Sequence, residues 1–384
     1  MQIDFHHAVT YAIARLSGFD HPDADVVAYA SQYVDDSTTS GFLRFNNGMR
    51  FSRQATAHPM LNAKNLDNDE NSLSWLPFHF LPGNEGAVAG TVIEDYSRKL
   101  ICRPDSPIAR AMMADVINVK DRPHALHRLG IASHVFVDTF AHQGFVGQLH
   151  ELNNATDVKD SNGDAIPVIK VPPIGHGQVG TCPDQPYLSW SYKDSNDKEM
   201  SRDNLGIFMQ AADRLCQEFR RYLLGSLEAD VPNLPDEDRG RIHDLLFCTR
   251  NDNGEERHQV WIQAIDDGYF SFGPTHLHYA GKGTGSWKHQ ALGDDYLKWL
   301  EVAENIAADT TKHPKNLIGR VGAVIHSVAS HAEAMAEHIG VEPVYYPYSQ
   351  EFHNSNYKLF HDAARDQRQA IFGSILPAHG IYAA

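Results

Sequence analysis

The sequence contains few cysteines, four among 384 residues. Cys102, Cys182, Cys216 and Cys248 lie far apart and form no C-x-x-C pair. This spacing suggests neither a disulfide framework nor a thiolate zinc site, so a reducing compartment is the simplest inference. The first residues lack the basic and long apolar regions of a signal peptide. We therefore expect a cytoplasmic protein, with signal-independent export as the alternative.

Positive charge is also scarce, with 33 Lys and Arg against 49 Asp and Glu and a formal net charge of −16. This balance argues against a protein that holds nucleic acid through a basic surface. The 42% hydrophobic and 21% charged residues are typical of a soluble globular protein, and no apolar run suggests a membrane span. No repeat, P-loop, Rossmann fingerprint or nucleophile elbow is present in the sequence.

Histidine, in contrast, is abundant, and one stretch concentrates it. Within residues 130–147, His134, Asp138 and His142 stand four residues apart in an apolar run without proline. Steps of four keep side chains on one face of an α-helix. Burying such polar groups is costly unless a partner satisfies them, and a divalent metal ion would do so. The alternative is three unrelated polar residues on a solvated face, or core histidines that bind carbonyls.

Apolar periodicity predicts helices over most of the chain. They span 4–17, 22–34, 85–101, 106–117, 122–145, 201–228, 236–248, 255–266, 291–309, 316–339 and 350–373. Prolines on both sides of His79 favour an extended strand or loop over 75–84, and a Gly/Asp turn followed by 166–171 predicts a short strand. We expect an all-α protein with a small β excursion near 160–192. Residues 1–200 would form a metal-binding helical core, and residues 201–384 a helical extension packed on it within one continuous domain.

Two further places attract attention. Asp35 and Asp36 end the predicted second helix, where the helix dipole disfavours anions, so a positive group should compensate them. His176 and Asp184 lie in a loop rich in glycine and proline beside aromatic residues, which often shapes a site. An ordinary turn is an equally good interpretation of that loop.

The order of these histidines and aspartates along the chain resembles that of the all-α, three-zinc family of prokaryotic phospholipases C and S1/P1-type nucleases. The match covers about 185 residues and runs through motifs that contain Met1 and His6, Asp35 in an Ala-Ser-x-x-x-Asp context, His79 with Phe80, His134 with Asp138 and His142, and His176 with Asp184. The chain looks closer to uncharacterised bacterial members, which have an Asp-Phe-His start and an H-x3-D-x2-A-H helix, than to the phospholipases and nucleases themselves. It departs from the family in starting with methionine in place of tryptophan. Its last His-to-acid spacing is also wider, which leaves His150 with Glu151 as the substitute pair.

The resemblance implies a multinuclear site with two or three zinc ions, with manganese or iron as possible replacements. One ion would be held by Asp35, His79, His134 and Asp138, a second by His142, His176 and Asp184, and a third by Met1 and His6, with Asp138 bridging. Asp35 or Asp36 would orient the attacking water or act as general base. The candidates for a substrate wall are Phe80, Phe145, Tyr187 and Trp190.

The expected function is a metal-dependent hydrolase of phosphate esters, of phospholipase C or nuclease type. The acidic balance favours a lipid head group or small phosphate ester over nucleic acid. One alternative is a redox enzyme with iron or manganese, although diiron sites usually use Glu-x-x-His pairs and here histidine and aspartate dominate. The other is a non-catalytic interaction protein with a structural metal, which a closed coordination sphere would support. The sequence indicates nothing about oligomeric state.

Overall fold

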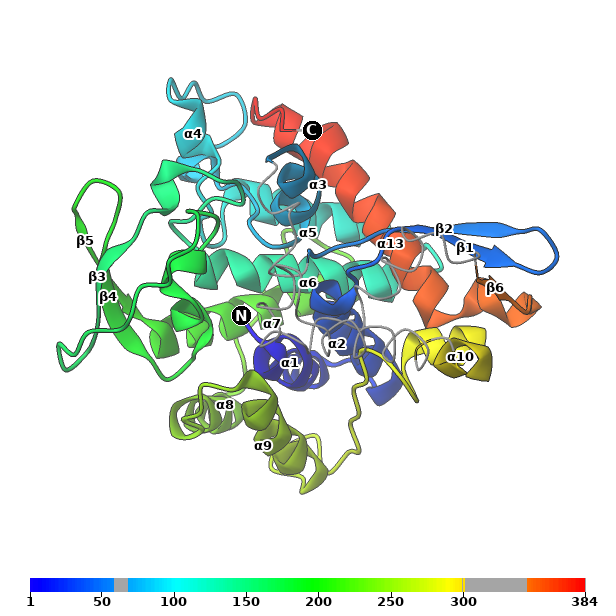
Figure 1. Ribbon diagram of the computed structural model, residues 1–384. Coiled ribbons are helices and arrows are strands. Elements are labelled where there is room, and N and C mark those ends of the chain that lie inside the picture. Colours follow the sequence, from blue (N-terminus) through cyan, green and yellow to red (C-terminus); the bar gives the residue numbers. More distant parts are fainter. Residues whose placement is uncertain (59–67, 299, 301–343, 384) are drawn as a thin grey trace, which may run out of the picture.

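The computed structural model describes residues 1–58, 68–298, 300 and 344–383 (Figure 1). The helix expected at 316–339 and most of the one expected at 291–309 lie outside these residues. Within them, helices form the bulk of the molecule and two small sheets lie at its periphery (Figure 1).

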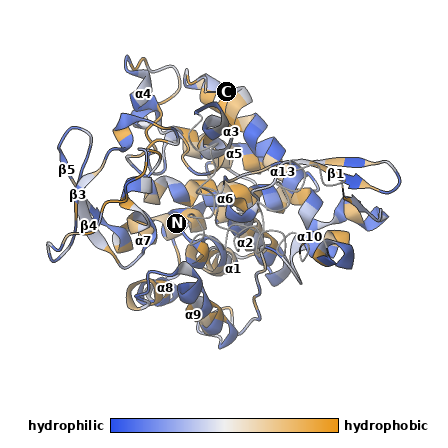
Figure 2. Cartoon of the chain, viewed as in Figure 1, coloured by the Kyte–Doolittle hydropathy of each residue, from blue (hydrophilic) through white to orange (hydrophobic). Residues whose placement is uncertain are grey.

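Helix α6 (Ala125–Ala141) runs through the middle of the molecule, and every one of its residues except Leu126 is buried. It packs against α2 (His21–Asp36), α5 (Pro107–Asn118), α7 (Asn204–Leu224) and α13 (Asn356–Ala370). Apolar residues line the inner faces of these helices and polar residues their outer faces (Figure 2). The hydrophobic core therefore surrounds the one helix that carries the H-x3-D-x3-H motif.

Helix α2 is fixed at both ends and along its length. The Asp20 carboxylate accepts a hydrogen bond from the Asp23 backbone N–H at 3.0 Å, which caps the first turn. Farther along, α2 approaches α6 so closely that a Cβ on Gly130 would lie 2.4 Å from the Val27 carbonyl oxygen. Glycine at this position therefore sets the helix separation, and the end of α2 that carries Asp35 lies beside α6.

The chain begins with a short π-helix, η1 (Asp4–Val9), that continues into α1 (Thr10–Ser17). The second half of the chain folds back onto these elements: α9 (Gly254–Asp266) packs on η1, as α13 does on α6. The other helices of this half are α8 (Asp236–Cys248), α10 (Trp287–Leu292), η9 (Gln350–Asn354), η10 (Ile371–Ile375) and α14 (Leu376–Ala378).

The expectation of an all-α protein is wrong, because the fold includes two three-stranded sheets. In one, β1 (Gly41–Phe45) pairs antiparallel with β2 (Arg50–Arg53) and parallel with β6 (Tyr345–Tyr346). In the other, β4 (Ser189–Lys193) lies between β3 (Thr156–Asp160) and β5 (Glu199–Asp203). The first sheet was missed because its hairpin buries only alternate residues of β1, and its third strand comes from far along the chain. The second corresponds to the predicted β excursion but ends later.

Two local predictions are met only in part. Residues 80–83 form the expected loop, but residues 75–78 are helical: α3 (Asn68–Phe78) includes Pro77 in its last turn, where the His79 and Phe80 N–H groups still reach the Trp75 carbonyl. A proline near the end of a helix breaks little of its hydrogen bonding. The long helix expected at 85–101 is reduced to η3 (Asn84–Gly86) and α4 (Tyr96–Lys99), because Gly86 and Gly90 adopt positive φ angles.

The predicted strand at 166–171 does not form, and the neighbouring residue Ala165 makes only an isolated bridge with Lys159. The remaining helical predictions are confirmed within a few residues where the structure describes them. Among the described residues, no helix combines the length and apolarity needed to span a bilayer.

Candidate metal centre

Helix α6 supplies the centre of the site. His134 and Asp138 stand one turn apart and are almost completely buried, with 0% and 1% exposure. His142 follows as the C-cap residue, and its backbone N–H donates to the Asp138 carbonyl oxygen at 2.8 Å. The predicted helical stripe is thus present, with its third member at the helix end.

The N-terminus of the chain reaches the same carboxylate. The α-amine of Met1 donates to Asp138 Oδ1 at 2.7 Å and lies 3.1 Å from Asp184 Oδ1. His6, on η1, places its Nε2 atom 3.2 Å from Asp138 Oδ1. One oxygen of Asp138 therefore faces both the terminal amine and the first histidine.

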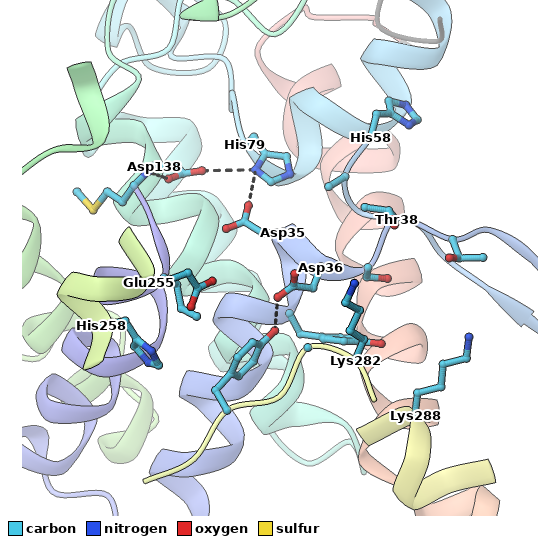
Figure 3. A pocket seen from close by; sticks show the side chains of 18 of the residues that line it. Asp35, Asp36, Thr38, His58, His79, Asp138, Glu255, His258, Lys282 and Lys288 are labelled. Atoms are coloured by element: carbon cyan, nitrogen blue, oxygen red, sulfur yellow. Dashed lines mark hydrogen bonds and ion pairs between the residues drawn. The ribbon is translucent and has the colours of Figure 1, made fainter. Parts of the chain in front are cut away.

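The other oxygen of Asp138 faces a second group of side chains. Its Oδ2 atom lies 3.2 Å from His134 Nε2 and 3.6 Å from His79 Nδ1. Asp35 Oδ1 lies 3.7 Å from His134 Nε2 and 3.8 Å from His79 Nδ1. Figure 3 shows His79 between the Asp35 and Asp138 carboxylates. This group joins the end of α2, the residue after α3, and α6.

A third group forms next to His142. His142 Nε2 lies 3.5 Å from Asp184 Oδ1, and His176 Nε2 lies 3.7 Å from Asp184 Oδ2. Two 3-10 turns, η5 (Gly177–Val179) and η6 (Cys182–Asp184), fold the intervening loop so that His176 and Asp184 meet. The wide sequence spacing of this pair is therefore closed by the loop.

These residues form three groups, and within each group one potential ligand atom per residue lies within 4.8 Å of the others. The groups are His6, His134 and Asp138; Asp35, His79 and His134; and His142, His176 and Asp184. His134 belongs to the first two groups, and the third adjoins them because His142 Nδ1 lies 3.6 Å from Asp138 Oδ2, so the three form one continuous centre. Imidazole and carboxylate are ligands that suit divalent transition metals. These buried groups are therefore able to bind a metal ion.

Hydrogen bonds orient the histidine rings. The Nδ1 atoms of His134, His142 and His176 lie 2.8–2.9 Å from the carbonyl oxygens of Ser31, His79 and Gly180. His79 instead places Nε2 3.1 Å from the Thr56 carbonyl. A carbonyl only accepts, so each of these ring nitrogens carries the proton. The other nitrogen of each ring then presents a lone pair to the centre, as in metal-ligating histidines.

Some buried polar atoms in the centre have no partner in hydrogen-bonding geometry among the described residues. They are both ring nitrogens of His6 and the Oδ1 atom of Asp184. A buried polar atom without a partner costs free energy of about 1–3 kcal/mol. Coordination of a cation would remove this cost at Asp184 and at one nitrogen of His6, so the residues present fit a metal centre.

The electrostatics are consistent with this fit. Burial alone would lower the pKa of the Met1 amine, but Asp138 and Asp184 more than reverse this effect and raise it to about 11. Burial lowers the pKa of His6 and of His134 to about 4. Burial would raise the pKa of Asp138. The neighbouring His142, Met1 amine and His134 outweigh this effect and hold the pKa of Asp138 well below its usual range. Neutral imidazole and ionised carboxylate are the forms that bind metal, whereas the amine must first lose a proton.

The centre lies at the wall of a cavity of about 900 Å³. Of the predicted substrate wall, only Phe80 lines the cavity, with its ring stacked on His142 at a centroid distance of 4.6 Å. Phe145 and Trp190 are buried in a neighbouring hydrophobic cluster. Tyr187 bonds instead to Asp252, at 2.7 Å. Of these four rings, only that of Phe80 therefore faces the cavity, because the other three pack or form hydrogen bonds elsewhere.

Three other candidate residues lie outside the three groups. The Asp36 carboxylate lines the cavity but accepts hydrogen bonds from Tyr279 and from Gln32, the latter at 3.3 Å. His150 accepts a hydrogen bond from the Leu152 N–H and caps a 3-10 turn, η4 (Glu151–Asn153), in which Glu151 is exposed. The substitute pair is therefore excluded, and Asp184 is the acid that meets His176.

Sequence reasoning missed the cavity residues that come from the second half of the chain. Glu255 and His258 of α9 line it, as do Lys282 and Lys288. The only signal was indirect, because the acids at the end of α2 called for a compensating positive group. Lys282 follows Gly281, whose position is so close to Asp36 that a Cβ there would lie 2.8 Å from Asp36 Oδ2.

Comparison with known proteins gives one assignment. No curated protein and no solved structure matches the chain. A family model matches residues 1–375, which is nearly the whole length. The chain therefore belongs to the family described as a family of unknown function, DUF6765.

Proposed function

We propose that this protein is a metal-dependent hydrolase of phosphate esters, of phospholipase C or nuclease type. The observation that carries the proposal is the convergence of a terminal amine, three carboxylates and five imidazoles in one place, where the amine residue, the carboxylates and three of the imidazoles line one cavity. The resemblance in ligand order to the three-zinc phospholipases and nucleases supports the same conclusion.

The groups indicate which residues would hold which ion. Asp35, His79, His134 and Asp138 Oδ2 would hold one, and His142, His176 and Asp184 a second. Met1 and His6 would hold a third together with Asp138 Oδ1. Zinc is the preferred candidate because imidazole and carboxylate ligands suit it, and manganese or iron would also be accepted.

When bound, such cations act as Lewis acids that clamp a phosphate ester, activate water and stabilise the leaving oxygen. Among the residues of the chain, Asp35 would orient the attacking water and accept its proton; its side chain is 36% exposed, lines the cavity and faces His79, which supports this role. Asp36 is the alternative for this role, and it also accepts a hydrogen bond from Tyr279. Phe80 positions His142 by stacking on its ring.

The substrate expected from the charge of the chain is a small phosphate ester or a lipid head group. A net charge of −16 disfavours binding of a long polyanion by repulsion over the whole surface. A small anionic ester, in contrast, would need to enter only the cavity where the proposed metal ions bind. Nucleic acid therefore remains the less favoured substrate.

The test uses untagged protein, stripped of metal and reloaded with zinc. We expect it to hydrolyse at least one of bis(p-nitrophenyl) phosphate, p-nitrophenylphosphorylcholine and single-stranded DNA. Asp138→Asn should reduce kcat/KM by more than about a hundredfold, because it removes the carboxylate proposed to bind two of the ions. The exposed Asp157→Asn is the matched control and should retain full activity.

Two outcomes would contradict the proposal. One is a folded, metal-free preparation with full activity. The other is a zinc-loaded protein that hydrolyses none of the three substrates. A redox-active iron or manganese complement in the isolated protein, with turnover of an electron donor, would support the alternative class of enzyme.

A further inference from the structure

Four polar side chains that the proposed function does not use line the cavity beside the metal ligands. They are Tyr33 on α2, Thr38 after the end of that helix, Trp75 on α3 and His361 on α13. Figure 3 shows Thr38 in this wall together with Asp36, which follows Tyr33 by one helical turn. Separate stretches of the chain thus bring these groups to one cavity.

The Tyr33 side chain is held firmly, but its hydroxyl is not used. The residue is 5% exposed, and its ring packs edge-on against Phe360 at a centroid distance of 4.8 Å. Within residues 1–58, 68–298, 300 and 344–383, the hydroxyl forms no hydrogen bond. Burial raises the pKa of Tyr33 well above its usual range, so the group is uncharged. Since a buried tyrosine hydroxyl usually has a partner, this one is available to a ligand in the cavity.

Thr38 and Trp75 each present another unused group. Thr38 Oγ1 and Trp75 Nε1 are buried and have no hydrogen-bond partner among the residues that the structure describes. Trp75 lies close to the metal centre, because its ring stacks on Phe80 at 5.2 Å and lies 6.2 Å from the His79 ring. Folded proteins leave few buried polar groups unpaired, and each one requires an explanation such as a bound water or ligand.

His361 is the fourth member of the set. Its Nδ1 atom lies 3.1 Å from the carbonyl oxygen of Gln54 and 3.2 Å from the Gln54 nitrogen, whereas its Nε2 atom is buried and has no partner in the described part of the chain. Burial lowers the pKa of His361 to about 3, so the ring is neutral.

The backbone that holds His361 also holds a metal ligand. The Thr56 carbonyl, two residues after Gln54, contacts His79 Nε2 at 3.1 Å. Two residues span at most about 7 Å of chain. A ligand bound at the metal centre therefore has His361 within a short distance.

The chemistry of the four groups indicates what they bind. A phenol, an alcohol and a neutral imidazole can each donate or accept a hydrogen bond, and an indole N–H donates one. An alkyl chain or a quaternary ammonium group forms no such bonds and would leave all four unpaired. A ligand with several hydroxyl groups would satisfy them, because each hydroxyl both donates and accepts. Aromatic rings in the same wall, such as that of Phe80, pack well on the uncharged skeleton of a cyclic ligand.

We propose that Tyr33, Thr38, Trp75 and His361 bind the alcohol part of the substrate, and that this alcohol is a polyhydroxylated ring. The substrate is then the phosphate ester of a sugar or a cyclitol, with its phosphate at the metal centre and its hydroxyl groups on these four residues. This inference rests on the proposed function for the phosphate end. The binding of the ring depends only on the cavity wall.

The binding experiment uses the zinc-loaded full chain and ligands that differ in their hydroxyl groups. Cyclohexyl phosphate is compared with myo-inositol 1-phosphate and with α-D-glucose 1-phosphate by isothermal titration calorimetry. At least one of the two hydroxylated ligands should have a Kd about tenfold or more below that of cyclohexyl phosphate, since its hydroxyl groups form hydrogen bonds that cyclohexane lacks. The tighter ligand of the two identifies a cyclitol or a sugar.

Two substitutions each remove a single hydroxyl from the wall. Tyr33→Phe and Thr38→Val should each reduce the preference for the hydroxylated ligand about threefold, and the double variant should reduce it further. Because neither hydroxyl bonds to any described residue, both variants should fold normally. Tyr382→Phe is the matched control: it removes a hydroxyl from a residue that is 74% exposed, and it should keep the full preference.

Equal Kd values for all three ligands would overturn the inference, because the four groups would then serve water alone. A preference that is undiminished in the double variant would also overturn it.

A hydrolysis experiment separates this inference from the proposed function. It compares the p-nitrophenyl ester of the tighter hydroxylated phosphate with p-nitrophenyl cyclohexyl phosphate. If neither ester is hydrolysed while the Kd preference persists, the proposed function fails and the ring-binding wall stands. If both esters are hydrolysed with equal kcat/KM and the phosphates bind equally, the ring-binding wall fails and the proposed function stands.

Discussion

The α-amine of Met1 lies 2.7 Å from Asp138 Oδ1, across 137 residues of sequence, and both groups are almost fully buried. A buried charge is stable only when it is paired, so the first residue of this chain is a structural part of the centre. The arrangement makes the N-terminus sensitive to any group attached to it.

Extending the N-terminus should therefore damage the site. Adding Gly-Ser before Met1 converts the amine to an amide. The amide nitrogen carries no charge and no free lone pair, so it can neither form an ion pair with Asp138 nor bind a cation. We expect the extended protein to lose about one equivalent of metal and most of its phosphoesterase activity. Mass spectrometry establishes the N-terminal residue, and elemental analysis gives the metal content. The same dipeptide placed at the C-terminus is the control; equal losses in both proteins would remove the amine from the site.

The first residues are held by a buried ion pair. Arg257 Nε lies 2.6 Å from Asp4 Oδ2, both side chains are 0% exposed, and Arg257 Nη2 also donates to Gln2 Oε1 at 2.6 Å. Arg257→Met should lower the free energy of unfolding by about 3–5 kcal/mol, because it leaves Asp4 buried and unpaired. It should also weaken binding of the metal ion assigned to Met1 and His6.

Urea denaturation of Arg257→Met, Asp4→Asn and the double variant measures the coupling between these side chains. We expect the double variant to be less destabilised than the sum of the single variants by more than about 1 kcal/mol. Additive losses would show that the pair does not hold the N-terminus.

The close approach of α2 and α6 gives a second stability prediction. In Gly130→Ala the new Cβ would meet the Val27 carbonyl at 2.4 Å and Ala30 Cβ at 2.7 Å, so the helices must separate. We expect a loss of about 3 kcal/mol in the free energy of unfolding, from overpacking. Because the carbonyl of Ser31 also orients His134, metal affinity should fall as well.

Gly240→Ala is the matched control, since nothing lies within 4 Å of a Cβ at this position of α8. Alanine there should stabilise the protein by about 0.5–1 kcal/mol. Equal effects of the two substitutions on stability would contradict the close packing of α2 and α6.

Stability should also depend on pH through His127. Burial lowers its pKa from 6.5 to about 3, although the bond to Asn356 opposes this shift. The unfolded chain then binds more protons than the folded one between these two values, so stability falls as the pH drops below 6.5. One such group changes the free energy of unfolding by at most about 1.4 kcal/mol per pH unit. In metal-free protein, His127→Gln should reduce the slope of unfolding free energy between pH 6.5 and 5; an unchanged slope would show that His127 does not contribute.

Much of the ligand set could be predicted from the sequence. His134 and Asp138 are four residues apart in a buried helix, so their side chains share one face of that helix whatever other elements pack around it. His142 was placed on the same stripe, and although it caps the helix with φ −88° and ψ 9°, its Nδ1 atom still lies 3.6 Å from Asp138 Oδ2. The resemblance supplied Met1 and His6, which no local pattern indicates.

The rest of the site depends on contacts that are distant in sequence. Lys282 and Lys288 line the same cavity as Asp36 although they lie about 250 residues farther along the chain, so no local sequence pattern predicts that they are near one another. His353, Tyr357 and His361 illustrate the same limit, since they stand four residues apart in the sequence. Tyr357 and His361 line the cavity, whereas His353 is exposed and bonds with Tyr348. Helical spacing alone does not distinguish a cavity wall from a solvated face.

The metal content of untagged, native protein tests the central claim most directly. Inductively coupled plasma mass spectrometry should find about three equivalents of zinc, or of a similar divalent metal, per chain. Asp138→Asn should contain fewer, and anomalous diffraction should place the ions among the three groups of ligands. Folded protein that contains less than about one equivalent, and that binds none from micromolar zinc, would contradict the account.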